Sequence, residues 1–210
     1  MSHYSKEYYN WQKEIGIISG KAQQFLFNKY IHSDDNVLEF GCGGGFLLKN
    51  IVAKNKMGVE INSHARTYAI ESGLNVVENI FAIPDSWADV IISNHVLEHT
   101  NNPFEELSLI FTKLKNGGKI VFVIPHEKKM KYSPNDINQH LFTWSEMNIG
   151  NLFVKIGFKI IIVKEIYHRY PPFSKFILDS FGLPIFHLFA HSFGFIMSHK
   201  VSQIQIVATK

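Results

Sequence analysis

The stretch from Val37 to Phe46 (Val-Leu-Glu-Phe-Gly-Cys-Gly-Gly-Gly-Phe) constrains the fold more than any other part of the chain. A short apolar run gives way to a glycine cluster and then to a second apolar segment. This pattern predicts a strand, a tight turn and the start of a helix. Glycines in such a turn let the backbone pass close to a ligand, because a Cβ would collide with it. The stretch therefore predicts a ligand-binding loop at the end of a buried strand.

The spacing of the glycines separates two classes of ligand. A dinucleotide fingerprint requires G-x-G-x-x-G, and counted from Gly41 the third glycine position is occupied by Phe46. Glu39 precedes the loop, where its carboxylate would repel a pyrophosphate but tolerate a cation. We therefore expect a positively charged ligand rather than NAD.

Two later segments repeat the pattern of an apolar strand with polar residues at its end, and a third combines a helix stop with the next strand. Glu60 ends one of them about 20 residues after Gly41, where an acid can accept both ribose hydroxyls. Together with the glycine loop, residues 57–61, 89–99 and 117–125 resemble motifs I, II, IV and V of the class I S-adenosylmethionine (SAM) methyltransferases. The resemblance covers roughly residues 36–125. It implies a SAM-dependent enzyme with SAM as cofactor and S-adenosylhomocysteine as its product.

Strands and helices alternate along the chain, which predicts an α/β fold with a mostly parallel sheet buried on both faces. The family's Rossmann-like fold has seven strands in the order 3-2-1-4-5-7-6, with helices on both faces. We expect one domain over residues 1–210, with an N-terminal helical cap over 1–31 and an apolar insertion over 166–200. Strands are predicted near 37–40, 56–60, 75–79, 88–93, 119–124, 158–164 and 201–208, and helices near 4–11, 17–31, 45–53, 63–72, 103–115 and 145–156.

The resemblance also assigns residues to the cofactor. It places the methionine portion beside the glycine loop, with Glu39 at that end, and the ribose on Glu60. It places the adenine amine near Asn79, where the family often has an acid, and the ring between Ile61 and Ile80. Core packing is the alternative for these two isoleucines, and a small buried thiol is the alternative for Cys42. The cofactor set is Glu39, Gly41, Cys42, Gly43, Gly45, Glu60, Ile61, Asn79, Ile80 and Asn94.

The acceptor side is expected in the polar loop over residues 135–145, because ligands bind beyond the carboxyl ends of parallel strands. The loop resembles the N-x-x-H-L-x-x-W stretch of small methyltransferases from bacterial surface-polysaccharide gene sets. His140 is the first candidate for a general base, with a purely structural loop role as the alternative, and His95 is the second. Substrate contacts are expected from Asn138, from Arg169, which can bind a phosphate or carboxylate, and from Tyr9, with Gln12 beside it. The alternatives are an exposed surface position for Arg169 and hydrophobic anchoring of the N-terminal residues.

The segment His95-Val96-Leu97-Glu98-His99 matches H-x-x-E-H, a zinc-protease pattern. That pattern requires both histidines on one helix face and a further ligand. Here the first histidine directly follows a strand, and no convincing third ligand comes later in the sequence. We therefore expect no metal site.

The charge and cysteine content of the chain restrict its binding partners and its cellular location. A net charge of +3 with scattered lysines argues against a nucleic-acid surface. A single cysteine fits a reducing compartment, and the polar N-terminal residues show no signal-peptide pattern, so a cytoplasmic location is expected.

The segment from Ser180 to His199 carries no charged residue, and its length would suit a membrane span. It contains Gly182 and Pro184, and both flanking strands must join one sheet. We therefore expect two short helices that cover the active site or form a homodimer contact. Contact with a membrane surface is not favoured.

The leading reaction is O-methylation of a small polar acceptor. A nucleotide-activated sugar, or a phosphorylated or phosphoramidate precursor of capsule or lipopolysaccharide, is expected from the resemblance. A quinone or lipid methyltransferase and a catalytically silent SAM-binding subunit are the alternatives. DNA amino-methylation is disfavoured, because Ser93-Asn94-His95-Val96 is not the Asn/Asp-Pro-Pro-aromatic clamp that such enzymes use.

Overall fold

The computed structural model describes residues 6–134 and 136–210, so Asn135 of the predicted acceptor loop lies outside the described residues. Within these ranges one sheet contains seven strands in the order β3-β2-β1-β4-β5-β7-β6. The pairs among β1 to β5 are parallel, and β7 runs antiparallel to both β5 and β6. The predicted fold class and strand order are confirmed. The strands are β1 (Asn36–Phe40), β2 (Asn55–Val59), β3 (Asn75–Val77), β4 (Ala88–Asn94), β5 (Leu114–His126), β6 (Lys159–Ile166) and β7 (Ser202–Thr209).

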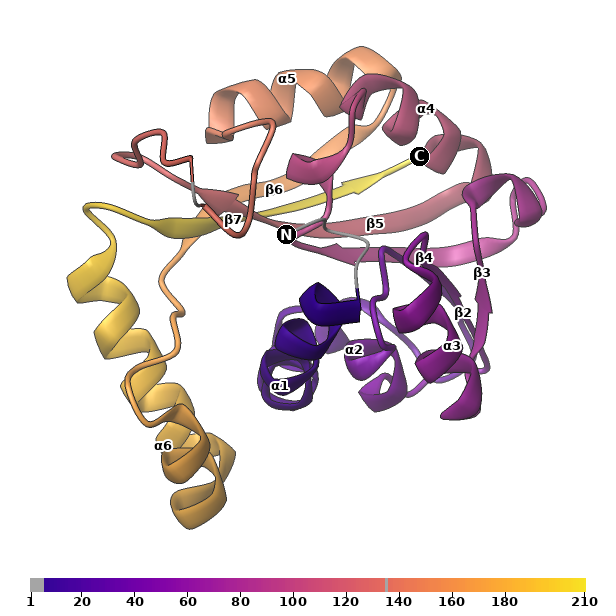
Figure 1. The fold of residues 1–210 in the computed structure, drawn as a ribbon. Coiled ribbons are helices and arrows are strands. Elements are labelled where there is room, and N and C mark those ends of the chain that lie inside the picture. The colour runs from indigo at the N-terminus through magenta and orange to yellow at the C-terminus, as the bar shows by residue number, and fades with distance from the viewer. Residues whose placement is uncertain (1–5, 135) are drawn as a thin grey trace.

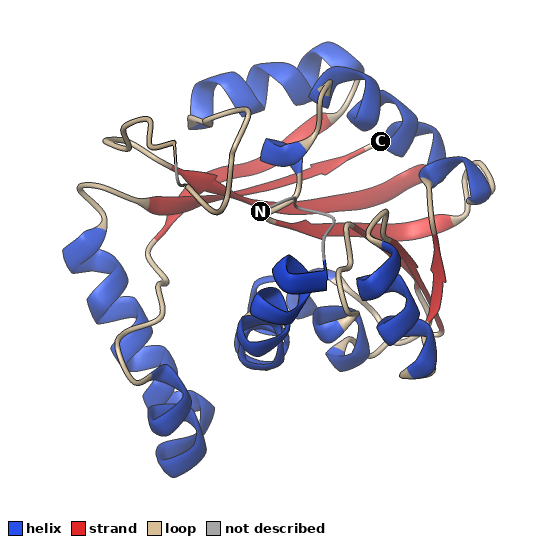
Figure 2. Ribbon diagram, in the orientation of Figure 1, coloured by secondary structure: helices blue, strands red, loops and turns tan. Residues whose placement is uncertain are grey.

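Helices cover both faces of the sheet (Figures 1 and 2), with α4 and α5 on one side and α1, α2 and α3 on the other. The start of α5 is fixed by two reciprocal hydrogen bonds. The Ser145 hydroxyl accepts a hydrogen bond from the Asn148 amide, and the Asn148 side chain accepts one from the Ser145 amide. The helices are α1 (Lys6–Ala22), α2 (Phe46–Asn50), α3 (Ser63–Glu71), α4 (Pro103–Lys113), α5 (Glu146–Ile156) and α6 (Ser174–Met197), with short 3-10 turns η1 (Gln24–Leu26), η2 (Asn28–Tyr30), η3 (Ile80–Ala82) and η4 (Leu97–His99).

The central strands are apolar on both faces because each face carries a helical layer. Leu38 and Ile91 pack in the cluster that contains residues of α4 and α5. Their chain neighbours Val37 and Val90 pack in the cluster that contains residues of α2. All four are buried. The side-chain period of two therefore sends successive apolar residues to two separate halves of the core.

The N-terminal segment differs from the two predicted helices over 4–11 and 17–31. The chain forms one continuous helix, α1, from Lys6 to Ala22, followed by η1 and η2. Its glycines allow close packing rather than a break. A Cβ on Gly16 would lie 2.3 Å from the Phe46 ring, and one on Gly20 would lie 2.2 Å from the Phe46 carbonyl oxygen. Helix packing against α2 therefore outweighs the low helix propensity of glycine.

The insertion before the last strand forms α6, which extends away from the sheet (Figure 1). The predicted interruption is present, because Gly182 has φ 74° and ψ 178° inside α6 and Pro184 follows it. One stripe of α6, with Phe186 and Ala190, packs on Ala22 of α1. By length and composition, α6 is the one helix of the described residues that could cross a membrane.

The remaining surface of α6 is exposed and apolar. Phe173, just before the helix, and Phe176 are more than half exposed. No residue of α6 lies among the described residues that line the cavity presented below, but Gly194 of α6 lines a smaller adjoining pocket that shares His95 and Arg169 with it. A cover over the active site therefore stays a prediction. Contact with a second copy stays a prediction for this surface. The large exposed apolar residues here are Phe173, Phe176, Phe181, Ile185, Leu188, Phe189, Phe195 and Ile196.

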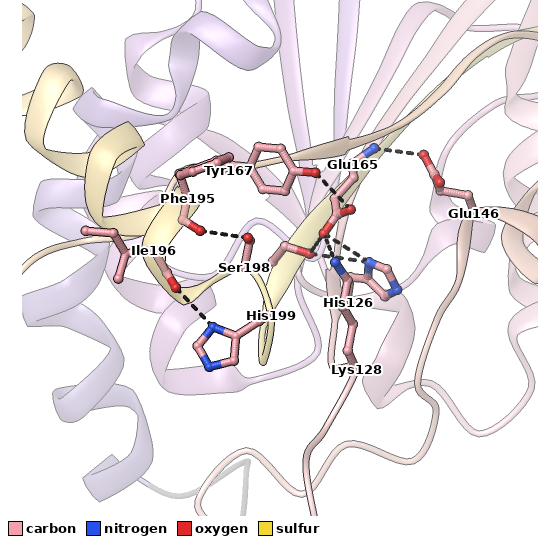
Figure 3. A network of polar contacts seen from close by, with 10 residues as sticks. His126, Lys128, Glu146, Glu165, Tyr167, Phe195, Ile196, Ser198 and His199 are labelled. Atoms are coloured by element: carbon pink, nitrogen blue, oxygen red, sulfur yellow. Dashed lines mark hydrogen bonds and ion pairs between the residues drawn. The ribbon is translucent and has the colours of Figure 1, made fainter.

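A polar network ties the sheet beside the C-terminal end of α6 (Figure 3). Glu165 of β6 accepts hydrogen bonds from Lys128, Ser202 and Tyr167, while its backbone amide donates to Glu146 at 2.9 Å. Burial alone would raise the pKa of Glu165, but the hydrogen bonds from Lys128 and Ser202 outweigh it and lower the pKa. The network therefore joins β5, β6 and β7 where the chain returns from α6.

Candidate active site

A cavity of about 1040 Å³ lies at the carboxyl ends of β1, β2, β4 and β5. The glycine loop after β1 forms part of its wall, and the loops after β4 and β5 form another part. This position follows from the parallel sheet, whose strand ends and connecting loops meet at one edge. The predicted cofactor and acceptor segments therefore share one cavity.

The glycine loop adopts left-handed backbone conformations at Gly41, Gly43 and Gly45. At Gly43 an added Cβ would meet nothing within 4 Å, whereas at Gly41 it would lie 2.4 Å from a methyl group of Val96. The loop is therefore open to the cavity at one glycine and packed against the segment after β4 at another.

Two of the predicted loop residues have a packing role. Gly45 is not among the described residues that line the cavity, and an added Cβ there would lie 2.2 Å from Leu74. Its prediction as a cofactor contact is therefore not met, because it faces the segment between α3 and β3. Cys42 does line the cavity but is nearly fully buried, and burial raises the pKa of its thiol.

Glu60 joins the glycine loop to the segment after β2. One carboxylate oxygen accepts a hydrogen bond from the Gly43 amide, and the other accepts one from the Asn62 amide, both at 2.7 Å. Burial raises the pKa of Glu60, while these backbone hydrogen bonds oppose the rise. Each oxygen keeps a second lone pair for a ligand hydroxyl. The predicted ribose acceptor therefore also holds the loop in place.

Glu39 and Asn94 bring unsatisfied polar atoms to the same cavity. Glu39 is buried, and burial raises its pKa well above the usual value. Asn94 donates a hydrogen bond to Gln23 at 2.6 Å. Among the described residues, Glu39 Oε2 and Asn94 Oδ1 have no hydrogen-bond partner. A ligand with ammonium hydrogens can satisfy such acceptors, so these residues fit the amino-acid end of SAM.

The opposite end of the cofactor region is apolar. Ile61 and Ile80 both line the cavity, the first half exposed and the second buried, and Asn79 lies beside them. Phe81, which is 72% exposed, also lines it and was not predicted. An apolar residue in the turn directly after β3 was the signal in the sequence. These side chains form an apolar surface on which a flat ring such as adenine can lie.

On α1, Tyr9 follows the anchoring alternative rather than substrate contact. Tyr9 is buried against Tyr68, with the ring centroids 6.0 Å apart, and is not among the described residues that line the cavity. Burial raises the pKa of its hydroxyl to about 12. The cavity wall is formed instead by Gln12, as predicted, and by four further residues of α1. These further residues are Trp11, Ile15, Gly16 and Ser19.

The acceptor end contains a buried carboxylate surrounded by histidines. Glu98 is fully buried, and its Oε1 lies 3.5 Å from His95 Nδ1 and 3.9 Å from His140 Nε2. His140 Nδ1 lies 3.0 Å from Glu127 Oε2, and the His140 ring contacts that of His99 at a centroid distance of 4.8 Å. The cavity is lined by His95, His99, Glu127 and His140, and also by the predicted Asn138 and Arg169.

The carboxylates shift the titration of His140. Burial alone would lower its pKa, but the hydrogen bond to Glu127 and the charges of Glu98, Glu127 and Asp136 outweigh it and raise the pKa. The loop after β5, which carries His140, is held beside Glu98 by a backbone hydrogen bond, because the Leu141 amide donates to the Glu98 carbonyl at 2.9 Å. The neighbouring carboxylates therefore favour the protonated form of His140, beside the cavity.

A second group of histidines lies where the chain enters and leaves α6. His168 Nε2 lies 3.1 Å from His187 Nδ1, and His191 packs against the same ring. Burial, and then the charges of His191 and His187, lower the pKa of His168 to about 3. The imidazole is therefore neutral in the folded protein throughout the physiological pH range.

This shift predicts a loss of stability in acid. Since the folded pKa of His168 lies below the unfolded value of about 6.5, its contribution is complete above about pH 6.5 and is lost as the pH falls toward 3, by up to about 1.4 kcal/mol per pH unit. His168→Phe should flatten the decline in unfolding free energy between about pH 6.5 and 4.5, measured by denaturant titration. The exposed His64→Ala should leave the decline unchanged. An unchanged decline in His168→Phe would contradict the assignment.

The strand order, the glycine loop and the acid after β2 together define a class I SAM-dependent methyltransferase fold with its cofactor site. Residues 14–163 match the family model described as methyltransferase domain. The chain therefore belongs to the methyltransferase domain family, as the sequence predicted, and its cofactor is SAM.

Curated relatives match part of the chain. The ubiquinone biosynthesis O-methyltransferase of Pectobacterium atrosepticum is 32% identical over 152 residues, which cover 67% of this chain and 55% of that protein. The protein of the same name from Nitrosococcus oceani is 28% identical over 122 residues, or 52% of each chain. The chain thus spans about half the length of these relatives.

Solved structures share the fold. A SAM-dependent methyltransferase from Archaeoglobus fulgidus superposes with a TM-score of 0.64 at 22% identity, covering 90% of this chain and 92% of that chain. The cyclase SpnF superposes with a TM-score of 0.66 at 17% identity, covering 90% of this chain and 80% of that chain. Since one of these proteins is named as a cyclase, the fold by itself does not decide the reaction.

Proposed function

We propose that the protein transfers a methyl group from SAM to a hydroxyl oxygen of a small acceptor. The observation that carries this proposal is that the cofactor residues and the Glu98–His140 cluster open into one cavity. Glu39 and Asn94 would hold the amino-acid end of SAM, Glu60 the ribose, and Ile61 with Ile80 the adenine. Bound SAM supplies a methyl group on a positively charged sulfur, which is a good leaving group.

The contribution of the protein is alignment and proton removal. Alignment in a preformed site can lower the barrier by about 7–11 kcal/mol. As the bond from the acceptor oxygen to the methyl carbon forms and the carbon–sulfur bond breaks, the hydroxyl proton must leave. Of the groups that line this end of the cavity, His95 and His140 are the two that we assign as candidate bases.

The charges of the cavity favour an uncharged acceptor. Among the described residues that line it, Arg169 is the one arginine or lysine, whereas Glu106 and Glu127 are acidic in addition to the two carboxyl groups assigned to SAM. This balance disfavours the phosphorylated polysaccharide precursor that was the first expectation from the sequence. A neutral aromatic or quinone-type hydroxyl fits better, and the names of the curated relatives support that class. A neutral phenol is therefore the proposed acceptor.

The test is a screen for SAM-dependent gain of a methyl group by mass spectrometry. Substituted phenols and catechols form one arm, and nucleotide-activated sugars form the other. We expect methylation in the phenol arm, with demethylated SAM formed in equal amount. Turnover in the sugar arm alone would contradict the neutral acceptor. SAM binding without turnover in either arm would favour the silent-subunit alternative.

A further inference from the structure

We propose that Glu98, His99 and His140 bind a divalent transition-metal ion at the acceptor end of the cavity. The side chains come from η4, directly after β4, and from the loop after β5. The binding itself is independent of the proposed function, but the role given to the ion below rests on it. The expectation from the sequence was that no metal binds, because no third ligand could be found there.

The distances between the donor atoms suit a shared ion. One donor atom from each of Glu98, His99 and His140 lies within 4.8 Å of the others. Glu98 Oε1 and His140 Nε2 are 3.9 Å apart, which is too long for a direct hydrogen bond. Since metal bonds to histidine nitrogen and carboxylate oxygen are about 2.0–2.2 Å, two ligands of one ion lie roughly 3–4 Å apart. An ion therefore fits between these groups after small side-chain movements.

The buried charge of Glu98 supports a cation at this place. Glu98 is fully buried, and among the described residues neither of its carboxylate oxygens has a hydrogen-bond partner. A buried carboxylate without a partner is strongly unfavourable. Its oxygen faces two imidazoles, of His95 and His140, rather than a lysine or an arginine. A bound cation would accept a lone pair from the Glu98 carboxylate and one from each of the two proposed imidazole ligands, His99 and His140.

Glu127 orients His140 for this role. Its carboxylate lies 3.0 Å from His140 Nδ1, on the side of the ring opposite Glu98. If the proton of the neutral His140 ring is on Nδ1 and points toward Glu127, then Nε2 presents a lone pair to Glu98. The Nε2 atom and the Glu98 oxygen are then two acceptors that face each other with no proton between them. A carboxylate on the outer nitrogen is the usual partner of a histidine that binds a metal. The arrangement therefore provides both the ligands and the group that orients one of them.

The open side of the site faces the acceptor. His99 and His140 line the cavity, whereas Glu98 lies behind them. Two imidazoles and one carboxylate suit ions such as Zn²⁺, Co²⁺ and Mn²⁺ and leave coordination positions free. An acceptor hydroxyl bound there would lose its proton more readily, and His95 would remain as the base that takes it. The ion would then hold the oxygen of the acceptor as the methyl group is transferred.

The probe for this site is Co²⁺, added to full-length protein that has been treated with a chelator and dialysed. We expect about one equivalent to bind, with a visible absorption band typical of nitrogen and oxygen ligands, and Zn²⁺ to displace it. His140→Ala should weaken binding about tenfold or more, and Glu127→Gln, which leaves all three ligands in place, should weaken it by about 10- to 100-fold. The exposed His64→Ala is the matched control and should bind as the parent does.

Absence of saturable Co²⁺ binding in the parent protein would overturn the proposal. Binding that is unchanged in both His140→Ala and Glu127→Gln would overturn it as well, because the ion would then lie elsewhere. If methyl transfer persists without metal binding, then only the metal site is wrong. If metal binds as expected but no phenol is methylated, then the proposed function is wrong and the site stands.

Discussion

Glu60→Ala is expected to weaken SAM binding about tenfold or more, because two charge-assisted hydrogen bonds of about 1.5–3 kcal/mol each would be lost from the ribose. The same substitution removes the acceptor for the Gly43 and Asn62 amides, both held at 2.7 Å. The glycine loop would therefore lose its tie to the segment after β2 as well as its ribose ligand. Isothermal titration calorimetry measures the affinity directly.

Two controls make this result interpretable. Circular dichroism should show that the fold is retained, and the exposed Glu105→Ala on α4 should bind SAM as the parent does. Unchanged affinity in Glu60→Ala would remove the assignment of Glu60 to the ribose. NADH should not bind, since Phe46 replaces the third glycine of a dinucleotide loop, and micromolar affinity for NADH would contradict that distinction.

The second large effect is expected at the acceptor end. His140→Ala should lower turnover about 100- to 10,000-fold while changing the SAM affinity by no more than about threefold. Its ring lies beside Glu98 and Glu127, on the acceptor side of the cavity and away from the ribose site. Its loss therefore removes either proton transfer or the polarisation of the acceptor oxygen. Single-turnover kinetics, in which the rate of formation of the methylated phenol is measured with SAM already bound, would separate this effect from binding.

The parallel variant is His95→Ala. A large loss of turnover in this variant alone would identify His95 as the group that takes the proton. If neither variant loses more than about tenfold, then neither histidine provides base catalysis of the usual size. The acceptor oxygen would in that case already be ionised when it binds.

The fold and the position of the glycine loop and Glu60 at one cavity were predictable because their signals are local. The central strands β1 and β4 are mainly apolar runs, and the glycines and Glu60 directly follow β1 and β2. The order of the strands then places them together without knowledge of side-chain contacts. Glu39, Gly43 and Glu60 therefore lie close to where the sequence placed them.

The remaining site residues depend on contacts between distant segments. The approach of His140 to Glu98 requires the path of the loop after β5, for which the sequence has no periodic signal. Tyr9 was predicted to line the cavity and Trp11 was not, because the rotation of α1 depends on how closely its glycines pack. Gly45 resembles Gly43 in the sequence, and only the position of Leu74 shows that it faces the other way.

The close packing of α1 against α2 limits which substitutions the chain can accept over evolution. Gly20 lies outside the cavity lining, yet a methyl group there would meet the Phe46 carbonyl oxygen at 2.2 Å. A backbone carbonyl cannot relieve such a clash by changing rotamer as a side chain can, and Phe46 directly follows the glycine loop. Selection should therefore hold Gly20 as strictly as it holds Gly41, although Gly20 performs no chemistry. In a comparison of many variants, an invariant position on α1 would report the mechanical coupling of that helix to the loop rather than contact with a substrate.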